Sequence, residues 1–207
     1  SDNKLRFFKT HNIFGAINNY SFTDTNNSIG AIYIVRDPRN VITSLKNHYE
    51  LNYNEAIDFM NNDRKYLYDD RFEGNYSTFH FLSSWSNHYK SWIMNKMFKI
   101  LVIKYEDLED KTFETVSRIF LFLNSLTGEK EELNKNKIMN CIKTTNFEVL
   151  QKKEQDLGFD ENISLNHNKK INFFYLGSKN KWKNILSPEI KNKANKLFEN
   201  DLKYFNY

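Results

Sequence analysis

The chain contains few residues that bend or cross-link a backbone: one cysteine, two prolines and six glycines among 207 residues. The single Cys141 excludes an internal disulfide and any cysteine-rich metal site. It is compatible with a reducing compartment, so we expect a cytoplasmic location. No apolar run approaches the ~20 residues that a membrane span requires. Because Ser1 is not a natural start, we expect that an upstream segment has been cut away.

A strong excess of charge of one sign is also absent, since the net charge is only +4. A nucleic-acid-binding protein would cluster its lysines and arginines, so we expect no nucleic-acid partner and favour a small anionic ligand. Hydrophobic residues make up 40% of the chain and aromatic residues 16%, which is sufficient for one core. Residues 1–207 therefore predict a single domain.

The most informative stretch is residues 31–49. Residues 32–35 are an uninterrupted apolar, β-branched run, which predicts a strand buried on both faces, as in a parallel sheet. Asp37 and Pro38 then form a helix start, with an acidic N-cap followed by proline at the first helical position. The expected helix has an apolar face formed by Val41, Ile42 and Leu45.

The turn between this strand and helix carries Arg36 and Arg39, and Ser44 lies about two helical turns farther along. A helix N-terminus attracts anions, and an arginine adds a bidentate donor suited to phosphate. In α/β sheets, ligands bind outside the carboxyl ends of strands. The pattern therefore indicates a phosphate site. An arginine that simply pairs with a carboxylate at an ordinary turn explains this stretch equally well.

Lys9 and His11 follow a short strand expected over residues 5–8. Residues two apart in extended chain point the same way, so these two side chains share one side. Histidine is the usual general base at neutral pH, and lysine can neutralise a developing oxyanion. The pair indicates a group-transfer site. The alternative is a surface lysine beside a hydrogen-bonded histidine.

Other elements are predicted from apolar spacing. Residues 98–105 indicate a second buried strand. Helices are expected over 54–60, 78–94, 112–126 and 131–142 and from about 144, and a last helix starts at Ser187 with Ile190, Ala194, Leu197 and Phe198 on one face. We expect a loop or irregular helix over 12–28 and loops over 63–76 and 156–170. His80 and His88 fall two turns apart on one expected helix without cysteine or carboxylate partners, so we expect no metal site.

Segment 36–44 resembles the motif by which soluble sulfotransferases hold the 3′-phosphate of PAPS (3′-phosphoadenosine 5′-phosphosulfate). In that family the arginine and the serine, here Arg36 and Ser44, both contact the phosphate. Lys9, Thr10 and His11 resemble the element whose histidine deprotonates the acceptor hydroxyl and whose lysine contacts the transferred sulfonyl group.

Three later segments are similar to the same family. Tyr105 opens a Tyr-Glu-Asp-Leu sequence whose tyrosine contacts adenine in sulfotransferases, although a core-edge tyrosine is common at such a place. Thr145 and Phe147 resemble the residues that cap the adenine, and Phe147 is equally plausible as core. Gly177, with Trp182 and Lys183 a few residues later, resembles the loop that covers the phosphate in this family. Glycine there lets the backbone approach the phosphate.

The chain departs from the family pattern at this loop and before Lys9. Tyr175 and Leu176 stand where the family has Arg-Lys, and Asn180 replaces the second glycine. Our hypothesis is that Lys179 and Lys181 supply the missing charge from shifted positions. No segment resembles the Pro-Lys-Ser-Gly-Thr-Thr-Trp loop that cradles the 5′-phosphosulfate, so we expect the first strand and this P-loop to be missing.

The resemblance implies an α/β fold in which a parallel sheet is flanked by helices, in a three-layer sandwich of the P-loop NTPase and kinase type. It implies a PAPS-dependent sulfotransferase that moves a sulfuryl group to a hydroxyl or amine of a small-molecule or glycan acceptor and releases PAP. The alternative is a non-catalytic PAP-binding module of the same fold. A kinase would need a Walker loop and Mg²⁺ ligands that the sequence lacks. The sequence leaves the oligomeric state open.

Overall fold

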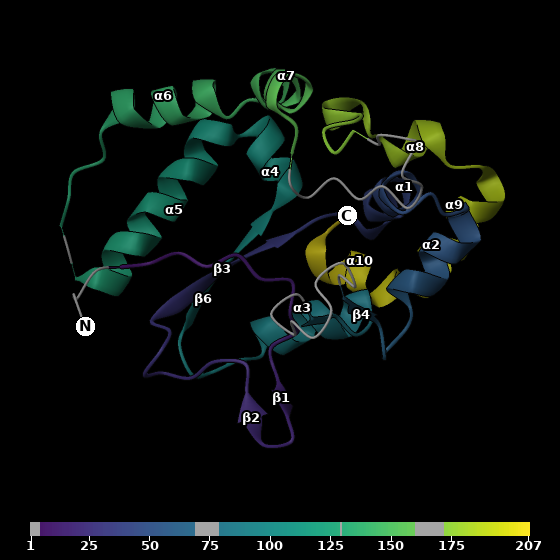
Figure 1. Ribbon diagram of the computed structural model, residues 1–207, viewed down its shortest axis with the longest axis horizontal. Coiled ribbons are helices and arrows are strands. Elements are labelled where there is room, and N and C mark those ends of the chain that lie inside the picture. Colours follow the sequence, from purple (N-terminus) through teal and green to yellow (C-terminus); the bar gives the residue numbers. More distant parts are fainter. Residues whose placement is uncertain (1–4, 69–78, 129, 160–171) are drawn as a thin grey trace.

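The computed structural model describes residues 5–68, 79–128, 130–159 and 172–207. Two parallel strands lie at its centre, β3 (Gly30–Val35) and β6 (Lys99–Lys104). They pair in register from Gly30 opposite Lys99 to Val35 opposite Lys104. Figure 1 shows helices on either side of this pair. The predicted α/β class, with a parallel sheet flanked by helices, is confirmed, and both central strands were predicted.

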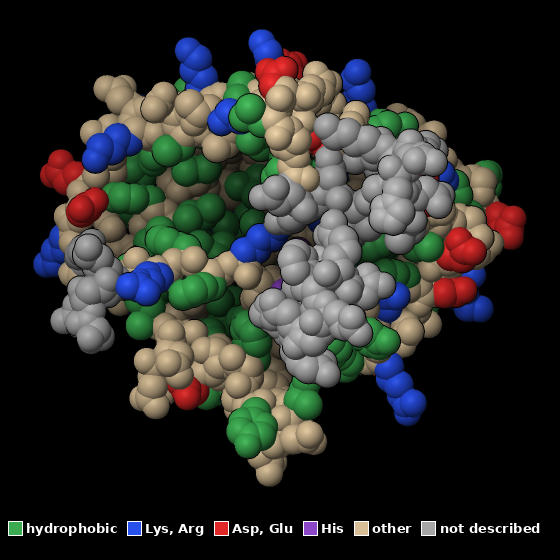
Figure 2. All heavy atoms as spheres, viewed as in Figure 1, with side chains coloured by type: hydrophobic (Ala, Val, Ile, Leu, Met, Phe, Trp, Pro, Cys, Tyr) green, Lys and Arg blue, Asp and Glu red, His purple; other side chains and the backbone are tan. Residues whose placement is uncertain are grey.

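The prediction that β3 is buried on both faces is wrong. Val35 is 2% exposed and lies against Tyr89 and Phe205, but Ile34 on the opposite face is 53% exposed. Helix α5 (Thr112–Thr127) packs against the neighbouring strand β6. Figure 2 shows a hollow in which hydrophobic side chains gather, and in Figure 1 this region is occupied by α5, α6 (Lys135–Thr144) and the central strands.

Helix α1 (Pro38–His48) begins as predicted. The Asp37 carboxylate accepts the Arg39 backbone N–H at 2.9 Å, which satisfies one of the donors left unpaired at a helix start. Ile42 is completely buried, and Val41 and Leu45 pack beside it. The main core lies where α1, α2 (Tyr53–Met60) and the C-terminal helices meet, and its buried members are Ile42, Ala56, Ile57, Met60, Leu186, Ile190, Ala194, Phe198 and Leu202.

The C-terminal segment forms α8 (Trp182–Ile185), α9 (Pro188–Leu197) and α10 (Glu199–Phe205). Ser187 caps α9, as its position before proline predicts. The sequence predicted one final helix with Leu197 on its buried face. The helix instead ends there, and Leu197 is 37% exposed.

The helix predicted over 78–94 is wrong in its first half. His80–Phe81 forms β5, which pairs antiparallel with β4 (Tyr66–Leu67), a strand inside the loop predicted over 63–76. Ser83 then takes a left-handed conformation (φ 59°), and Ser84 caps α3 (Trp85–Ile93). The apolar residues before Ser83 have helical spacing, but their contacts are those of a strand.

The N-terminal segment also differs from expectation. Residues 5–8, expected as a strand, have no regular secondary structure. Within 12–28, expected as a loop or irregular helix, β1 (Ala16–Ile17) and β2 (Tyr20–Ser21) form a hairpin. Its two turn residues, Asn18 and Asn19, both have positive φ, which is the conformation of a two-residue type I′ turn and one that asparagine tolerates. The consecutive asparagines were the missed signal.

The other predicted helices lie close to their expected positions, and they are α5, α6 and α7 (Phe147–Leu157). Helix α5 ends at Gly128 in the left-handed conformation typical of a helix C-terminus, and its predicted apolar stripe is only partly buried. Helix α4 (Tyr105–Asp110), which follows β6 directly, and the short 3₁₀ turn η3 (Gly177–Lys179) were not predicted. Most of the loop predicted over 156–170 lies outside the described residues.

None of the helices in the described ranges has the length and apolar composition that crossing a bilayer requires. Within the same ranges, no group of three or more histidine, cysteine, aspartate or glutamate side chains is arranged to hold a metal ion.

Candidate functional site

Arg36 and Ser44, predicted as a pair, lie together. Arg36 directly follows β3, and Ser44 lies two turns into α1, so the strand–helix unit brings them to the same side. The Arg36 Nη1 donates to the Ser44 Oγ at 3.3 Å. The Arg36 guanidinium also lies over the Tyr105 ring, 4.2 Å from its centroid. Three predicted site residues therefore form one cluster at the carboxyl ends of β3 and β6.

The Arg36 guanidinium forms no ion pair with any carboxylate in the described part of the chain. Its Nε is buried and has no hydrogen-bond partner there. A buried donor without a partner carries a free-energy cost, so this Nε remains available to a ligand. The nearby Glu106 carboxylate accepts the Asp37 backbone N–H at 3.2 Å and the Tyr207 hydroxyl at 3.1 Å.

Arg39, the other arginine of the turn, is a structural residue. It is 7% exposed, and its guanidinium donates to both carboxylate oxygens of Asp37, at 2.7 Å for the shortest contact. It also donates to Asn195 at 3.1 Å and lies over the Trp182 ring at 3.9 Å. The sequence left open the alternative that an arginine of this turn simply pairs with a carboxylate. Arg39 forms that pair, with Asp37, and Arg36 does not.

Two titratable groups report on the charge around Arg36. Burial raises the pKa of the Tyr105 hydroxyl, with Arg36 opposing the shift, so the ring is neutral at physiological pH. Burial also raises the pKa of Glu109, and the positive charges of Arg36 and Lys181 oppose that shift. The part suggested for Lys181 in binding the phosphate stays a prediction.

Asn180 is a site residue that the sequence reasoning missed. It is 7% exposed, and its amide Nδ2 donates to the Ser44 Oγ at 2.9 Å and to the Asn40 carbonyl at 3.3 Å. Its Oδ1 accepts the Thr43 hydroxyl. The departure from glycine at position 180 was the available signal, because a side chain there can do what glycine cannot: it fastens the loop to α1.

The Ser44 hydroxyl consequently uses its whole bonding capacity within the protein. Its oxygen accepts from Arg36 and Asn180, and its proton goes to the Asn40 carbonyl at 3.2 Å. A phosphate oxygen can only accept, so contact with it requires this proton to leave the Asn40 carbonyl. After this change the Asn40 carbonyl still accepts a hydrogen bond from the Asn180 amide, so losing the Ser44 proton costs less free energy.

Gly177 lies against the ring of Phe147, which begins α7. It has a positive φ of 53°, and a Cβ at this position would come 2.8 Å from the Phe147 ring carbons. Glycine is therefore required at position 177 because the backbone approaches the Phe147 ring closely.

Two other predicted residues lie apart from the Arg36 cluster. The Thr145 hydroxyl donates to the Cys141 carbonyl at 2.7 Å and closes α6. Lys179 is exposed in η3, and no contact in the described ranges joins it to Arg36.

Lys9 and His11 lie in a second cluster with two other histidines. The His11 ring meets His80 edge-on, with centroids 5.7 Å apart, and its backbone carbonyl lies 3.1 Å from the Nε2 of His88. Burial lowers the pKa of His80, and the positive charge of Lys9 lowers it further. The His11 ring itself is exposed. The His11 and His80 rings thus lie together, and the charge of Lys9 acts on His80, whereas the shared side expected for Lys9 and His11 stays a prediction.

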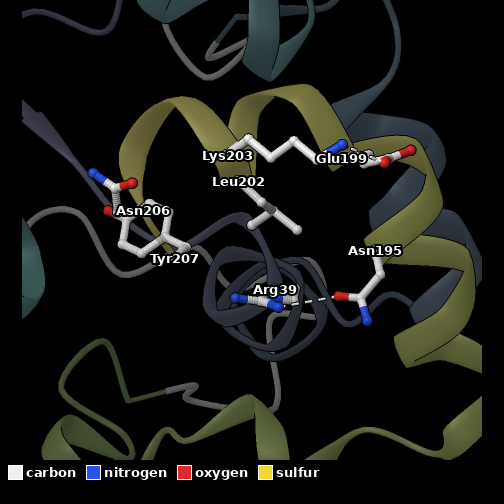
Figure 3. Close-up of a pocket in the computed structure, with 7 residues that line it drawn as sticks. All are labelled: Arg39, Asn195, Glu199, Leu202, Lys203, Asn206 and Tyr207. Atoms are coloured by element: carbon white, nitrogen blue, oxygen red, sulfur yellow. Dashed lines mark hydrogen bonds and ion pairs between the residues drawn. The ribbon is translucent and has the colours of Figure 1, made fainter.

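A shallow pocket lies elsewhere, between α1 and the C-terminal helices, with a volume of about 450 Å³ (Figure 3). No predicted site residue lines it, and its one arginine, Arg39, is held by Asp37 and Asn195. The pocket therefore has no part in the candidate site. Its lining residues are Arg39, Asn195, Glu199, Leu202, Lys203, Asn206 and Tyr207.

A family model described as the sulfotransferase domain matches residues 1–206. The chain belongs to the sulfotransferase family. It is 26% identical to luciferin sulfotransferase of Photinus pyralis over 146 residues, which is 70% of this chain and 35% of that protein. The sulfotransferase chain thus spans about a third of the length of this relative.

Solved structures confirm the sulfotransferase fold. Mouse sulfotransferase SULT7A1, complexed with PAP, is 16% identical with a TM-score of 0.50, over 83% of this chain and 57% of that one. Retinol dehydratase, in complex with androsterone and PAP, is 20% identical with a TM-score of 0.53, over 83% of this chain and 47% of that one. The resemblance found in the sequence is confirmed, whereas the role of each site residue stays a prediction.

Proposed function

We propose that the Arg36–Ser44 unit binds the 3′-phosphate of PAPS and that the chain belongs to an enzyme that transfers a sulfuryl group. One observation carries the proposal: the buried Nε of Arg36 has no protein partner in the described residues, beside a helix N-terminus and the Ser44 hydroxyl. A guanidinium with an unused donor and no carboxylate partner fits a phosphate dianion. The PAP in the solved relatives supports this choice of ligand.

The chain's residues fit a nucleotide of this kind in several places. Tyr105 presents a neutral ring beside Arg36, and the Gly177–Phe147 contact brings a second ring against the covering loop. We assign adenine contacts to Tyr105, Phe147 and Thr145. Lys179 and Lys181 add positive charge to the loop. When bound, PAPS supplies an activated sulfuryl group on a phosphate leaving group.

In the transfer step, the chain contributes a base and a cation. We assign His11 to accept the proton of the acceptor hydroxyl or amine through a ring nitrogen, because its ring is exposed and its backbone is fastened. We assign Lys9 to neutralise charge on the sulfonyl oxygens. The retinol and androsterone bound to retinol dehydratase suggest apolar alcohols as the first acceptors to test, ahead of amines and glycans.

The 3′-phosphate assignment is tested by calorimetric titration with PAP, with AMP as the ligand that lacks the 3′-phosphate. We expect PAP to bind more tightly, and Arg36→Gln to weaken PAP about 10- to 100-fold because a charge-assisted contact is lost. Arg118→Gln, an exposed arginine on α5, is the matched control and should leave affinity unchanged. Equal affinity for PAP and AMP, or an unaffected Arg36→Gln variant, would refute the assignment.

Transfer itself is tested with radiolabelled PAPS and a panel of acceptors. A labelled acceptor product supports the enzyme. Tight PAP binding with no product from any acceptor class would favour the alternative, a nucleotide-binding module without transfer activity. The Tyr175–Leu176 pair, which replaces two basic residues of the family loop, makes this second outcome worth a dedicated measurement.

A further inference from the structure

One face of α3 holds the backbone around His11. His88, Ser91 and Trp92 have the i, i+3, i+4 spacing that places side chains on a single helix face. The His88 Nε2 lies 3.1 Å from the His11 carbonyl, and the Trp92 Nε1 donates to the Asn12 carbonyl at 3.0 Å. The Ser91 Oγ accepts the Phe14 backbone N–H at 3.0 Å.

The hydrogen bonds of His88 determine its tautomer. A carbonyl can only accept, so Nε2 carries the proton and donates to the His11 carbonyl. The Tyr33 hydroxyl lies 2.8 Å from Nδ1, which must then accept from it. Burial lowers the pKa of His88, with the His11 carbonyl opposing the shift, and burial raises that of Tyr33. Both groups are therefore neutral, as this chain of bonds requires.

We propose that His88, oriented by Tyr33, is a positioning residue that holds the backbone of His11 at the transfer site. The inference rests on the proposed role of His11 as the general base. Two hydrogen bonds connect Tyr33 of β3, through the His88 side chain of α3, to the His11 carbonyl. Residues 5–11 have no regular secondary structure of their own. Of the three α3 contacts, the His88 bond is the one made to His11 itself, and through Tyr33 it joins that residue to β3, the strand that Arg36 follows.

Two substitutions of His88 test the roles of its two ring nitrogens separately. The amide nitrogen of glutamine reaches as far from Cβ as the histidine Nε2, so His88→Gln can still donate to the His11 carbonyl. Asparagine is one bond shorter, so His88→Asn keeps a polar group near Tyr33 and loses the donor. Because small misplacements of a reacting group are costly, we expect His88→Asn to lower kcat about 10- to 100-fold. We expect His88→Gln to recover most of the rate, and both variants to keep the affinity for PAP.

Nuclear magnetic resonance provides a readout that does not depend on turnover. We expect the His88 ring to be the neutral Nε2–H tautomer, and the His11 ring signals to move in His88→Asn but not in His88→Gln. An Nδ1–H tautomer of His88, or equal His11 signals in the two variants, would overturn the positioning role. Equal losses of kcat in both variants, matched by equal losses in urea midpoint, would also overturn it and leave a purely structural residue.

The same experiments distinguish failure of this inference from failure of the proposed function. If His11→Ala keeps full kcat, His11 is not the base. The tautomer and the His11 signals would still show whether His88 fastens this segment. If His11→Ala is inactive while His88→Asn keeps full kcat, the base assignment stands and the positioning role is refuted.

Discussion

Arg36 and Ser44 are eight residues apart on one strand–helix unit, whereas the segment around His11 is fastened by side chains and a backbone N–H from residues 80 to 92. The first arrangement follows from local geometry, since a strand that feeds directly into a capped helix places its last residue beside the second helical turn. The second needs a helix and a strand that are distant in sequence. The binding half of the candidate site is therefore a local motif, and the transfer half is assembled by tertiary contacts.

The largest expected effect comes from the assembled half. His11→Ala should lower kcat by two orders of magnitude or more, because a positioned general base contributes ~10²- to 10⁴-fold. The affinity for PAP should not change, since the ring contact of His11 is to His80 and its carbonyl bonds His88, in a cluster separate from that of Arg36. Initial rates with labelled PAPS and calorimetry on the same preparation measure the two quantities. A loss of PAP affinity equal to the loss in rate would contradict the separation of the two halves.

The local half contains two arginines with opposite roles, and unfolding experiments separate them. Arg39→Gln should lower the free energy of unfolding by about 3 kcal/mol, because it leaves the buried Asp37 carboxylate without its partner. Arg36→Gln should cost much less stability and act on PAP binding instead. Urea denaturation of both variants measures the difference. Similar losses of stability would mean that Arg36 is also a structural residue.

Asn180→Gly sharpens the comparison by restoring the family's residue. It removes the amide that bonds the Ser44 hydroxyl and the Asn40 carbonyl, so the loop loses its attachment to α1. Each such bond contributes about 1 kcal/mol, and we expect PAP to bind about 5- to 10-fold more weakly. Asn184→Gly, in the same segment on α8, serves as the control. Tighter PAP binding in Asn180→Gly would mean that the asparagine obstructs the site.

The smallest expected effect concerns pH. Because the folded pKa of His88 is lowered by burial, the unfolded chain binds more protons than the folded one between that pKa and 6.5. The contribution of His88 to stability is therefore complete above pH 6.5 and declines as the pH falls through this window. The gain in urea midpoint from pH 5.5 to 7.5 should be smaller in His88→Gln than in the parent chain. An identical gain would show that His88 does not titrate in this way.

The same division explains which predictions held. The helix start at Asp37 and Pro38, the end of α5 at Gly128 and the start of α9 after Ser187 were all readable, because capping depends on neighbouring residues. The helix predicted over 78–94 failed because the strand His80–Phe81 is determined by its pairing with Tyr66–Leu67. Helical spacing of apolar residues cannot reveal such a distant partner.

Site chemistry follows the same rule at the level of single residues. The residues of the turn alone could not show which of its two arginines pairs with a carboxylate, because the Arg39 guanidinium is held partly by Asn195, 156 positions away. Sequence reasoning treated Asn180 as a missing glycine, although the side chain bonds Ser44 across 136 positions. It placed His80 and His88 on one helix, where the structure brings both to His11 by different routes.

The order of amino acids alone determined the strand–helix unit and the resemblance to sulfotransferases, and it predicted a phosphate site at that unit, because turns, caps and short motifs act over a few residues. Only the tertiary structure decided which arginine remains available to an anion, why asparagine stands at position 180 and what fastens His11. These features depend on hydrogen bonds between residues far apart in the chain, and such bonds exist only once the helices and strands have packed.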